Sequence, residues 1–192
     1  MSSQTILRPS TPIDTTRFRL RPLTMADFDD VHAYYCRADV ARYLYWNACT
    51  PEETRAYLTR NVARTAIEND DDGLVYAVVP HDTGRVVGQV TLRLASREHR
   101  QGEVGFILHP DHHGRGYATE AATVMLDLGF GELGLHRIEG RCDARNTGSA
   151  RVLERLGMRR EAHLRENEIF KGVWGDELVY AILEREWRDR RR

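Results

Sequence analysis

The stretch from residue 103 to residue 128 constrains the fold of this chain more than any other. It begins with an apolar segment, passes through a turn that carries Gly114 and Gly116, and continues as an amphipathic segment that starts with small side chains. This pattern predicts a strand, a glycine turn and a helix whose first turn is nearly bare. Such a junction directs free backbone N–H groups and the positive end of a helix dipole at one point. That point suits an anion such as a pyrophosphate.

The length and composition indicate a single globular domain. The chain has 192 residues, of which 41% are hydrophobic and 30% charged, and both fractions are typical of soluble domains. The formal net charge of −1 gives no overall field that would gather nucleic acid or an anionic membrane. We expect one domain over residues 15–187, a loosely held leader segment over residues 1–14 and a solvated basic tail over residues 188–192.

The cysteines and histidines show no pattern typical of a metal site or a disulfide. Cys36, Cys49 and Cys142 form no C-x-x-C pair, and the adjacent His112 and His113 would point in different directions. The N-terminus has no charged-then-apolar signal pattern, and no apolar run approaches the ~18 residues that a membrane span needs. We therefore expect a cytoplasmic protein without a metal site, and we interpret Cys142 as structural.

Hydrophobic periodicity predicts an α+β fold with the order β-α-α-β-β-β-α-β-α-β-β. Hairpins precede one βαβ crossover, so the sheet should be mixed and mostly antiparallel, with helices flanking it. The clearest helix start is Thr50-Pro51, with Glu53 three residues after the cap. The predicted elements lie at residues 17–21, 24–35, 50–68, 74–79, 85–94, 103–109, 117–128, 136–142, 146–156, 168–171 and 177–183.

Three segments resemble the GNAT superfamily of acetyl-CoA-dependent N-acetyltransferases, in particular its ribosomal-protein N-terminal acetyltransferases of the RimJ/RimL type. Residues 113–118, His-Gly-Arg-Gly-Tyr-Ala, fit the family pattern [Q/R]-x-x-G-x-[G/A] except that His113 takes the leading position. The longer run over residues 114–121 and the segment 146–157, which begins Asn-Thr-Gly-Ser, resemble this branch more specifically. The resemblance covers residues 15–187 and implies the GNAT fold.

The resemblance implies acetyl-CoA as co-substrate and assigns residues to it. The backbone of the glycine turn would hold the pyrophosphate, the main chain of the splayed strand would pair with the pantetheine arm, and Asn146 would contact that arm. The expected coenzyme-binding residues are Phe106, Ile107, Leu108, His113, Gly114, Arg115, Gly116, Tyr117, Ala118, Thr119 and Asn146. From the residues alone, the glycines could equally serve an ordinary turn without a ligand, and Asn146 is also a good helix N-cap.

The resemblance places two residues near the reaction. Ser149 would protonate or hydrogen-bond the departing thiolate, because residues 146–156 contain none of the tyrosines that many members use. Glu103 is our candidate general base, acting through water, although it could be a solvated edge-strand carboxylate. At pH 7 an α-amine costs only about 1.4 kcal/mol to deprotonate, whereas a lysine costs about 4.6 kcal/mol. An N-terminal acceptor would therefore need little base catalysis.

The expected reaction is direct attack of a primary amine on acetyl-CoA in a ternary complex, without an acyl-enzyme. A protein N-terminal α-amine is our first expectation for the acceptor. The alternatives are a small-molecule amine (an aminoglycoside, a polyamine or an amino acid) and a non-catalytic acyl-CoA-binding module. Tyr43, Tyr45 and Trp46 lie where the family places its acceptor wall, and the Asp70–Asp72 run would favour a cationic drug only if it faced the cleft. Homodimers are common in the family, so the resemblance also implies that this chain could form one.

Overall fold

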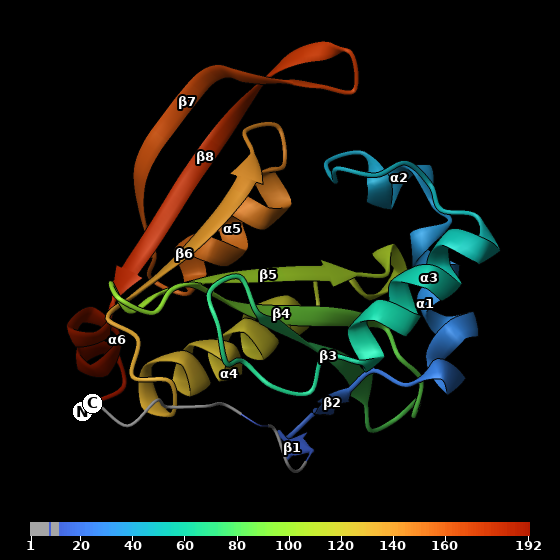
Figure 1. Cartoon of the computed structure of the whole chain (residues 1–192), viewed down its shortest axis with the longest axis horizontal. Helices are drawn as coiled ribbons and strands as arrows, with labels where there is room; N and C mark the ends of the chain where they lie inside the picture. The colour runs from blue at the N-terminus through green and yellow to red at the C-terminus, as the bar shows by residue number, and fades with distance from the viewer. Residues whose placement is uncertain (1–7, 9–11) are drawn as a thin grey trace.

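The computed structural model describes residue 8 and residues 12–192; the rest of the predicted leader segment lies outside the described residues. One eight-stranded mixed sheet has the order β1-β2-β3-β4-β5-β6-β8-β7 (Figure 1). The pair β5–β6 is parallel, and the other described neighbouring pairs are antiparallel. The predicted α+β class is confirmed. The strands are β1 (Ile13–Asp14), β2 (Phe18–Pro22), β3 (Gly73–Pro80), β4 (Gly88–Ser96), β5 (Gln101–Leu108), β6 (Arg137–Asp143), β7 (Arg159–Phe170) and β8 (Val173–Leu183).

Helices cover both faces of the sheet and divide its apolar side chains between two cores. The larger core includes Val104 of β5 and Met125 of α4, and the second includes Val31 of α1 and Leu58 of α3. Alternation along a strand sends successive side chains to opposite faces, so β3 places Tyr76 and Val78 in the larger core and Ala77 and Val79 in the second. The helices are α1 (Phe28–Tyr35), α2 (Ala38–Ala41), α3 (Pro51–Val62), α4 (Tyr117–Gly131), α5 (Thr147–Arg155) and α6 (Glu184–Arg190).

The predicted helix start at Thr50 is confirmed, but the helix end near residue 68 is wrong. The Thr50 hydroxyl accepts the Glu53 N–H at 3.2 Å, and the Glu53 carboxylate accepts the Thr50 N–H at 2.8 Å. The helix then ends at Val62. Ile67 is fully buried in the larger core, whereas Leu58 belongs to the second core. The chain must leave the helix to pass from one core to the other.

The C-terminal strands are much longer than predicted. The expected turn at residues 172–176 lies mostly within β8, and the actual reversal is at Lys171–Gly172, where both φ angles are positive. Most side chains of β7 are exposed, so the strand shows no apolar alternation in the sequence. In Figure 1 the β7–β8 hairpin rises above the sheet and its tip extends toward α2. There the Lys171 ammonium donates to the carbonyls of Ala41 (2.7 Å) and Trp46 (2.8 Å).

Three short elements were absent from the predicted order. Strand β1 lies in the predicted leader segment and pairs with β2, and helix α2 follows α1. Helix α6 crosses the predicted boundary at residue 187. Its Trp187 is buried and donates its indole N–H to Asp127 at 2.8 Å, while Arg191 pairs with the same carboxylate at 2.9 Å. Within the described residues, no helix is long and apolar enough to cross a membrane.

Candidate active site

The centre of the sheet is forked between β5 and β6. The two strands pair at Gln101↔Arg137, Gly102↔Ile138 and Glu103↔Glu139, and beyond these residues they separate. A cavity of about 310 Å³ occupies the fork, with the β5 residues 104–107 on one side and the β6 residues 141–143 on the other. The splayed strand predicted at residues 103–109 is therefore present. Its main chain beyond Glu103 is not paired with β6 and faces this space.

The glycine turn presents a row of free backbone donors. Gly114 (φ 74°) and Gly116 (φ 81°) adopt left-handed conformations that a side chain would strain. The first hydrogen bond of α4 runs from Glu120 N to Gly116 O at 3.0 Å. In the described part of the chain, the N–H groups of residues 114–119 have no acceptor, and the buried Thr119 hydroxyl also lacks a partner. These groups, at the positive end of a 15-residue helix, fit a pyrophosphate.

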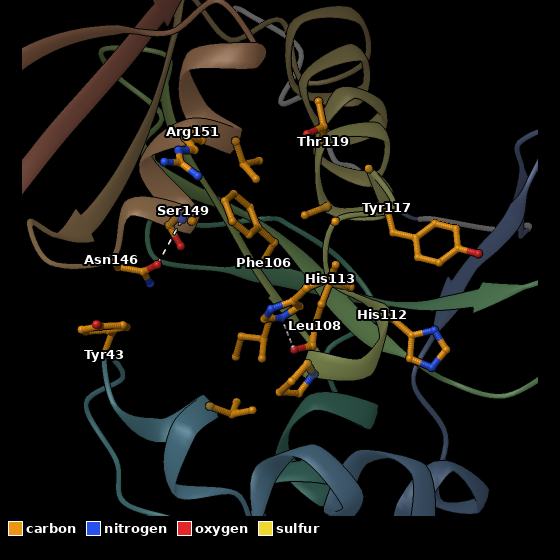
Figure 2. Close-up of a pocket in the computed structure, with 18 of the residues that line it drawn as sticks. Tyr43, Phe106, Leu108, His112, His113, Tyr117, Thr119, Asn146, Ser149 and Arg151 are labelled. Carbon is orange, nitrogen blue, oxygen red and sulfur yellow. Dashed lines mark hydrogen bonds between the residues drawn. The ribbon is translucent and has the colours of Figure 1, made fainter.

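Two side chains hold the glycine turn in place. Arg17 reaches from the start of β2, donates to the Arg115 carbonyl at 2.7 Å and pairs with Glu120 at 2.6 Å. This pairing neutralises a carboxylate that would otherwise stand beside the anion site. His113 binds the Leu108 carbonyl through Nε2 at 3.1 Å and so ties the turn to the end of β5 (Figure 2). The motif gave no signal for Arg17, because it lies about a hundred residues from the turn.

A larger cavity of about 570 Å³ extends from the fork to the glycine turn. Of the predicted coenzyme-binding residues, Arg115 does not line it and is exposed. Arg151 and Arg155 of α5 do line it and were missed by the sequence reasoning, since nothing distinguished them from other helix-surface arginines. The predicted residues that line it are Phe106, Ile107, Leu108, His113, Gly114, Gly116, Tyr117, Ala118, Thr119 and Asn146.

Asn146 and Ser149 line both cavities from the start of α5. Asn146 caps the helix: its side-chain oxygen accepts the Ser149 N–H at 3.1 Å, as the dashed line in Figure 2 shows. The Ser149 hydroxyl has no hydrogen-bond partner within the described residues. It is therefore free to contact a ligand where the two cavities meet.

Glu103 lies at the closed end of the fork and lines neither cavity. Its carboxylate accepts from Arg93 at 2.5 Å, and Arg93 also pairs with Asp71. The structure therefore does not bring Glu103 together with Asn146 and Ser149. A role for Glu103 in proton removal would require intervening water, and that role stays a prediction.

The fork cavity has an aromatic wall. Tyr43 and Trp46 line it as predicted, together with Tyr35 and Tyr57. Tyr45 does not: its side chain is 74% exposed, and its hydroxyl donates to Glu168 of β7 at 2.9 Å. These aromatic side chains come from α1, α3 and the segment that follows α2, so the wall depends on how the helices are placed over the sheet.

Charged groups in the fork cavity are already paired. Asp143 binds Arg145 through both carboxylate oxygens (2.9 and 2.6 Å), and this pairing holds the pKa of Asp143 below its usual value. Arg141 contacts Glu139 and Glu177 at 3.1 and 3.4 Å. The cavity therefore offers no unpaired carboxylate among its described lining residues.

The other residues considered from the sequence lie away from the reaction centre or are chemically inert. The Asp70–Asp72 run lines neither cavity, and Asp71 is 80% exposed at its side chain. Cys142 does line the fork, but burial raises the pKa of its thiol to about 11, so it is not a thiolate at neutral pH. No group of metal-ligating side chains occurs among the described residues.

Comparison with known proteins gives consistent relatives over most of the chain. The acetyltransferase (GNAT) domain model matches residues 17–159. The uncharacterized N-acetyltransferase YnaD of Bacillus subtilis is 32% identical over 175 residues, which are 91% of this chain and 98% of YnaD. The structure of a GNAT-family acetyltransferase from Bacillus anthracis superposes with a TM-score of 0.82 at 33% identity, covering 92% of this chain and all of that one.

Relatives whose names include a substrate differ from one another. The putative ribosomal N-acetyltransferase YdaF of Bacillus subtilis is 29% identical over 104 residues, 54% of this chain and 57% of YdaF. Spermidine N(1)-acetyltransferase of Escherichia coli is 25% identical over 169 residues, 88% of this chain and 87% of that protein. Similarity alone therefore leaves the acceptor amine open between a protein and a polyamine.

Proposed function

The chain belongs to the GNAT family and is an N-acetyltransferase, and from this we propose that it acetylates the N-terminal α-amine of a protein with acetyl-CoA. The observation that carries the choice of acceptor is the fork cavity: apolar, aromatic and uncharged polar side chains line most of it, and its described charged lining residues, Asp143 and Arg141, are already paired. A peptide N-terminus carries one amine and otherwise neutral backbone. A polyamine carries several positive charges that would need free carboxylates.

The coenzyme side of the proposal uses groups that lack partners within the described chain. The N–H groups of residues 114–119 would bind the pyrophosphate, and Arg151 and Arg155 would add positive charge along the same cavity. The main chain of β5 beyond Glu103 would receive the pantetheine arm as strands receive an added peptide. Acetyl-CoA supplies the acetyl group as a thioester that an amine can attack directly.

The chemistry that remains for the protein is mainly positioning. A neutral α-amine held in the fork forms the new N–C bond as the C–S bond breaks. Ser149, whose hydroxyl is free in the described structure, would donate a hydrogen bond to the departing sulfur. The proton released by the amine would leave through water toward Glu103. Because an α-amine is close to half neutral near pH 8, this transfer needs only a weak base.

The similarity to a spermidine acetyltransferase makes a polyamine the second candidate acceptor. The carboxylates on the sheet face beside the fork are Glu103, Glu139 and Glu177, and each is paired with an arginine of β4 or β6. A polyamine would have to displace these arginines to bind there. We therefore rank a polyamine below a peptide N-terminus as the acceptor.

An acceptor screen tests the proposal. The protein is incubated with acetyl-CoA and, separately, with peptides that begin with Ser or Ala, with spermidine, with an aminoglycoside and with free amino acids. Thiol release gives the rate and mass spectrometry identifies the acetylated product. We expect the peptides to give the highest kcat/KM. A clear preference for spermidine, the aminoglycoside or an amino acid would contradict the proposed acceptor while leaving the acetyltransferase activity intact.

A further inference from the structure

Three tyrosine hydroxyls converge on one buried glutamine beside the fork cavity. Gln89 of β4 is 4% exposed and lines the cavity. Its Oε1 accepts from the Tyr34 hydroxyl at 3.0 Å, and its Nε2 donates to the hydroxyls of Tyr35 (3.1 Å) and Tyr57 (2.6 Å). Tyr34 is fully buried and does not line the cavity, whereas Tyr35 and Tyr57 do.

Counting hydrogens shows that this cluster has an excess of hydroxyl hydrogens that no oxygen of the cluster accepts. Gln89 uses both amide hydrogens, and Tyr34 uses its hydroxyl hydrogen on Oε1. The Tyr35 and Tyr57 hydroxyls each accept from Gln89 and each keep one hydrogen. Neither of these two hydrogens has an acceptor among the hydrogen bonds of the described residues.

Of the two unpaired hydroxyl hydrogens, the one that can reach a ligand belongs to Tyr57. Tyr35 is 2% exposed, whereas Tyr57 is only half-buried and borders the cavity, so its O–H is the one that can turn into open space. Rotating the Gln89 amide by half a turn would not remove the excess. It would leave one amide hydrogen and the hydroxyl hydrogen of the fully buried Tyr34 unpaired, at a larger cost.

We infer that the Tyr57 hydroxyl, held by Gln89, donates a hydrogen bond into the fork and selects acceptors with a hydrogen-bond-accepting oxygen next to their amine. This inference rests on the proposed function and narrows it: the first peptide carbonyl of an N-terminus is such an oxygen. The carbon chain of a polyamine offers only methylene groups there. Burial also raises the pKa of Tyr57, so the hydroxyl keeps its proton at neutral pH.

The test compares wild type with Tyr57→Phe on acceptors that differ in this oxygen. One pair is a peptide beginning with Ala and the same peptide with its first peptide bond replaced by a trans alkene; the other is alaninamide and isopropylamine. We expect Tyr57→Phe to lower kcat/KM about tenfold for the two carbonyl acceptors and less than about twofold for their partners. For each acceptor, the ratio of kcat/KM between wild type and Tyr57→Phe is compared, so that differences in amine pKa between acceptors cancel.

Tyr34→Phe is the matched control, because it removes a hydroxyl from the same glutamine outside the cavity. It should lower thermal stability without changing the ratio between carbonyl and non-carbonyl acceptors. Acetyl-CoA affinity, measured by calorimetry, should be unchanged in Tyr57→Phe and so reports that this variant is folded. An equal loss on both members of a pair, or wild-type preference for isopropylamine or spermidine, would overturn the inference. Acetylation of alaninamide but not of the peptide, with the Tyr57 effect retained, would instead refute the proposed protein acceptor alone.

Discussion

At the scale of single residues, the proposed chemistry depends on groups that the fold leaves without partners. The amides of residues 114–119, the Thr119 hydroxyl and the Ser149 hydroxyl have no acceptor or donor in the described chain. A helix N-terminus leaves backbone donors free, and their gathering at one cavity with the buried Thr119 hydroxyl indicates a polar ligand. The carboxylates beside the fork, in contrast, are already paired with arginines.

Ser149→Ala tests the residue closest to the proposed leaving group. Losing a hydrogen bond to a developing thiolate should lower kcat by about tenfold to a hundredfold, while the KM for acetyl-CoA changes little. Thr147→Ala is the control, because it removes a hydroxyl from the same helix turn at an exposed position outside both cavities. Steady-state kinetics by thiol release measures both variants. Equal activity of Ser149→Ala and Thr147→Ala would remove Ser149 from the mechanism.

The sequence predicted many of the residues that line the larger cavity, because they lie in three short segments: residues 106–108, residues 113–119 and the start of α5. Gly114, Gly116 and Thr119 act through backbone geometry that glycine and a bare helix start reveal directly. Arg17, Gln89 and Tyr57 were not predicted, since each reaches its place through strand pairing or helix packing across the sheet. Their partners lie far away in the sequence, and no local pattern marks them.

At the scale of elements, the site is a junction between β2, β5, α4 and α5. The end of β5 is tied to the glycine turn by His113, and β2 is tied to it by Arg17. The element prediction succeeded where strands carry many buried apolar side chains, as in β3, which is buried on both faces, and in β4. It failed for β7, whose side chains are mostly exposed, and at the end of α3, where tertiary burial of Ile67 outweighs helix propensity.

Arg17→Leu should loosen the glycine turn. The variant loses the bond to the Arg115 carbonyl and leaves Glu120 unpaired near the anion site, so acetyl-CoA should bind about tenfold more weakly. Arg19→Leu on the same strand loses only an exposed pair with Asp14 and should bind acetyl-CoA as wild type does. Isothermal titration calorimetry gives both dissociation constants. Identical values for the two variants would mean that Arg17 does not position the turn.

At the scale of the whole molecule, the second core and its helices form the proposed acceptor side of the site, so their stability matters for the proposed function. Asp27 lies in the short turn before α1 and is 6% exposed. Arg21 of β2 binds both of its oxygens at 2.8 and 2.6 Å, and the Thr24 N–H donates to it at 2.7 Å. This pair connects the sheet to the helices that carry the aromatic wall.

Asp27→Asn should destabilise the fold in a pH-dependent way. Burial raises the pKa of Asp27, but the bonds from Arg21 and Thr24 outweigh it and leave the pKa below the usual 3.8. The carboxylate therefore stabilises the folded state above that pH, and the contribution is lost as the pH falls through the lowered pKa. We expect a loss of about 2 kcal/mol at pH 7, shrinking toward zero as the pH falls through the lowered pKa of Asp27.

Urea unfolding at several pH values measures this difference. Asp29→Asn, at an exposed position in the first turn of α1, is the control and should stay within about 0.5 kcal/mol of wild type. A difference between wild type and Asp27→Asn that does not depend on pH would show that the Asp27 charge is not what stabilises this junction.

The identity of the amine that receives the acetyl group tests the proposed function most directly. A single peptide that begins with Ala and contains an internal lysine is mixed with acetyl-CoA and spermidine at pH 7. The reaction then offers three kinds of acceptor: an α-amine, a lysine side chain and a polyamine. Fragmentation mass spectrometry then locates the product. We predict acetylation of the α-amine ahead of the lysine and the spermidine. Acetyl groups on the lysine side chain or on spermidine, with the α-amine left free, would contradict the proposal.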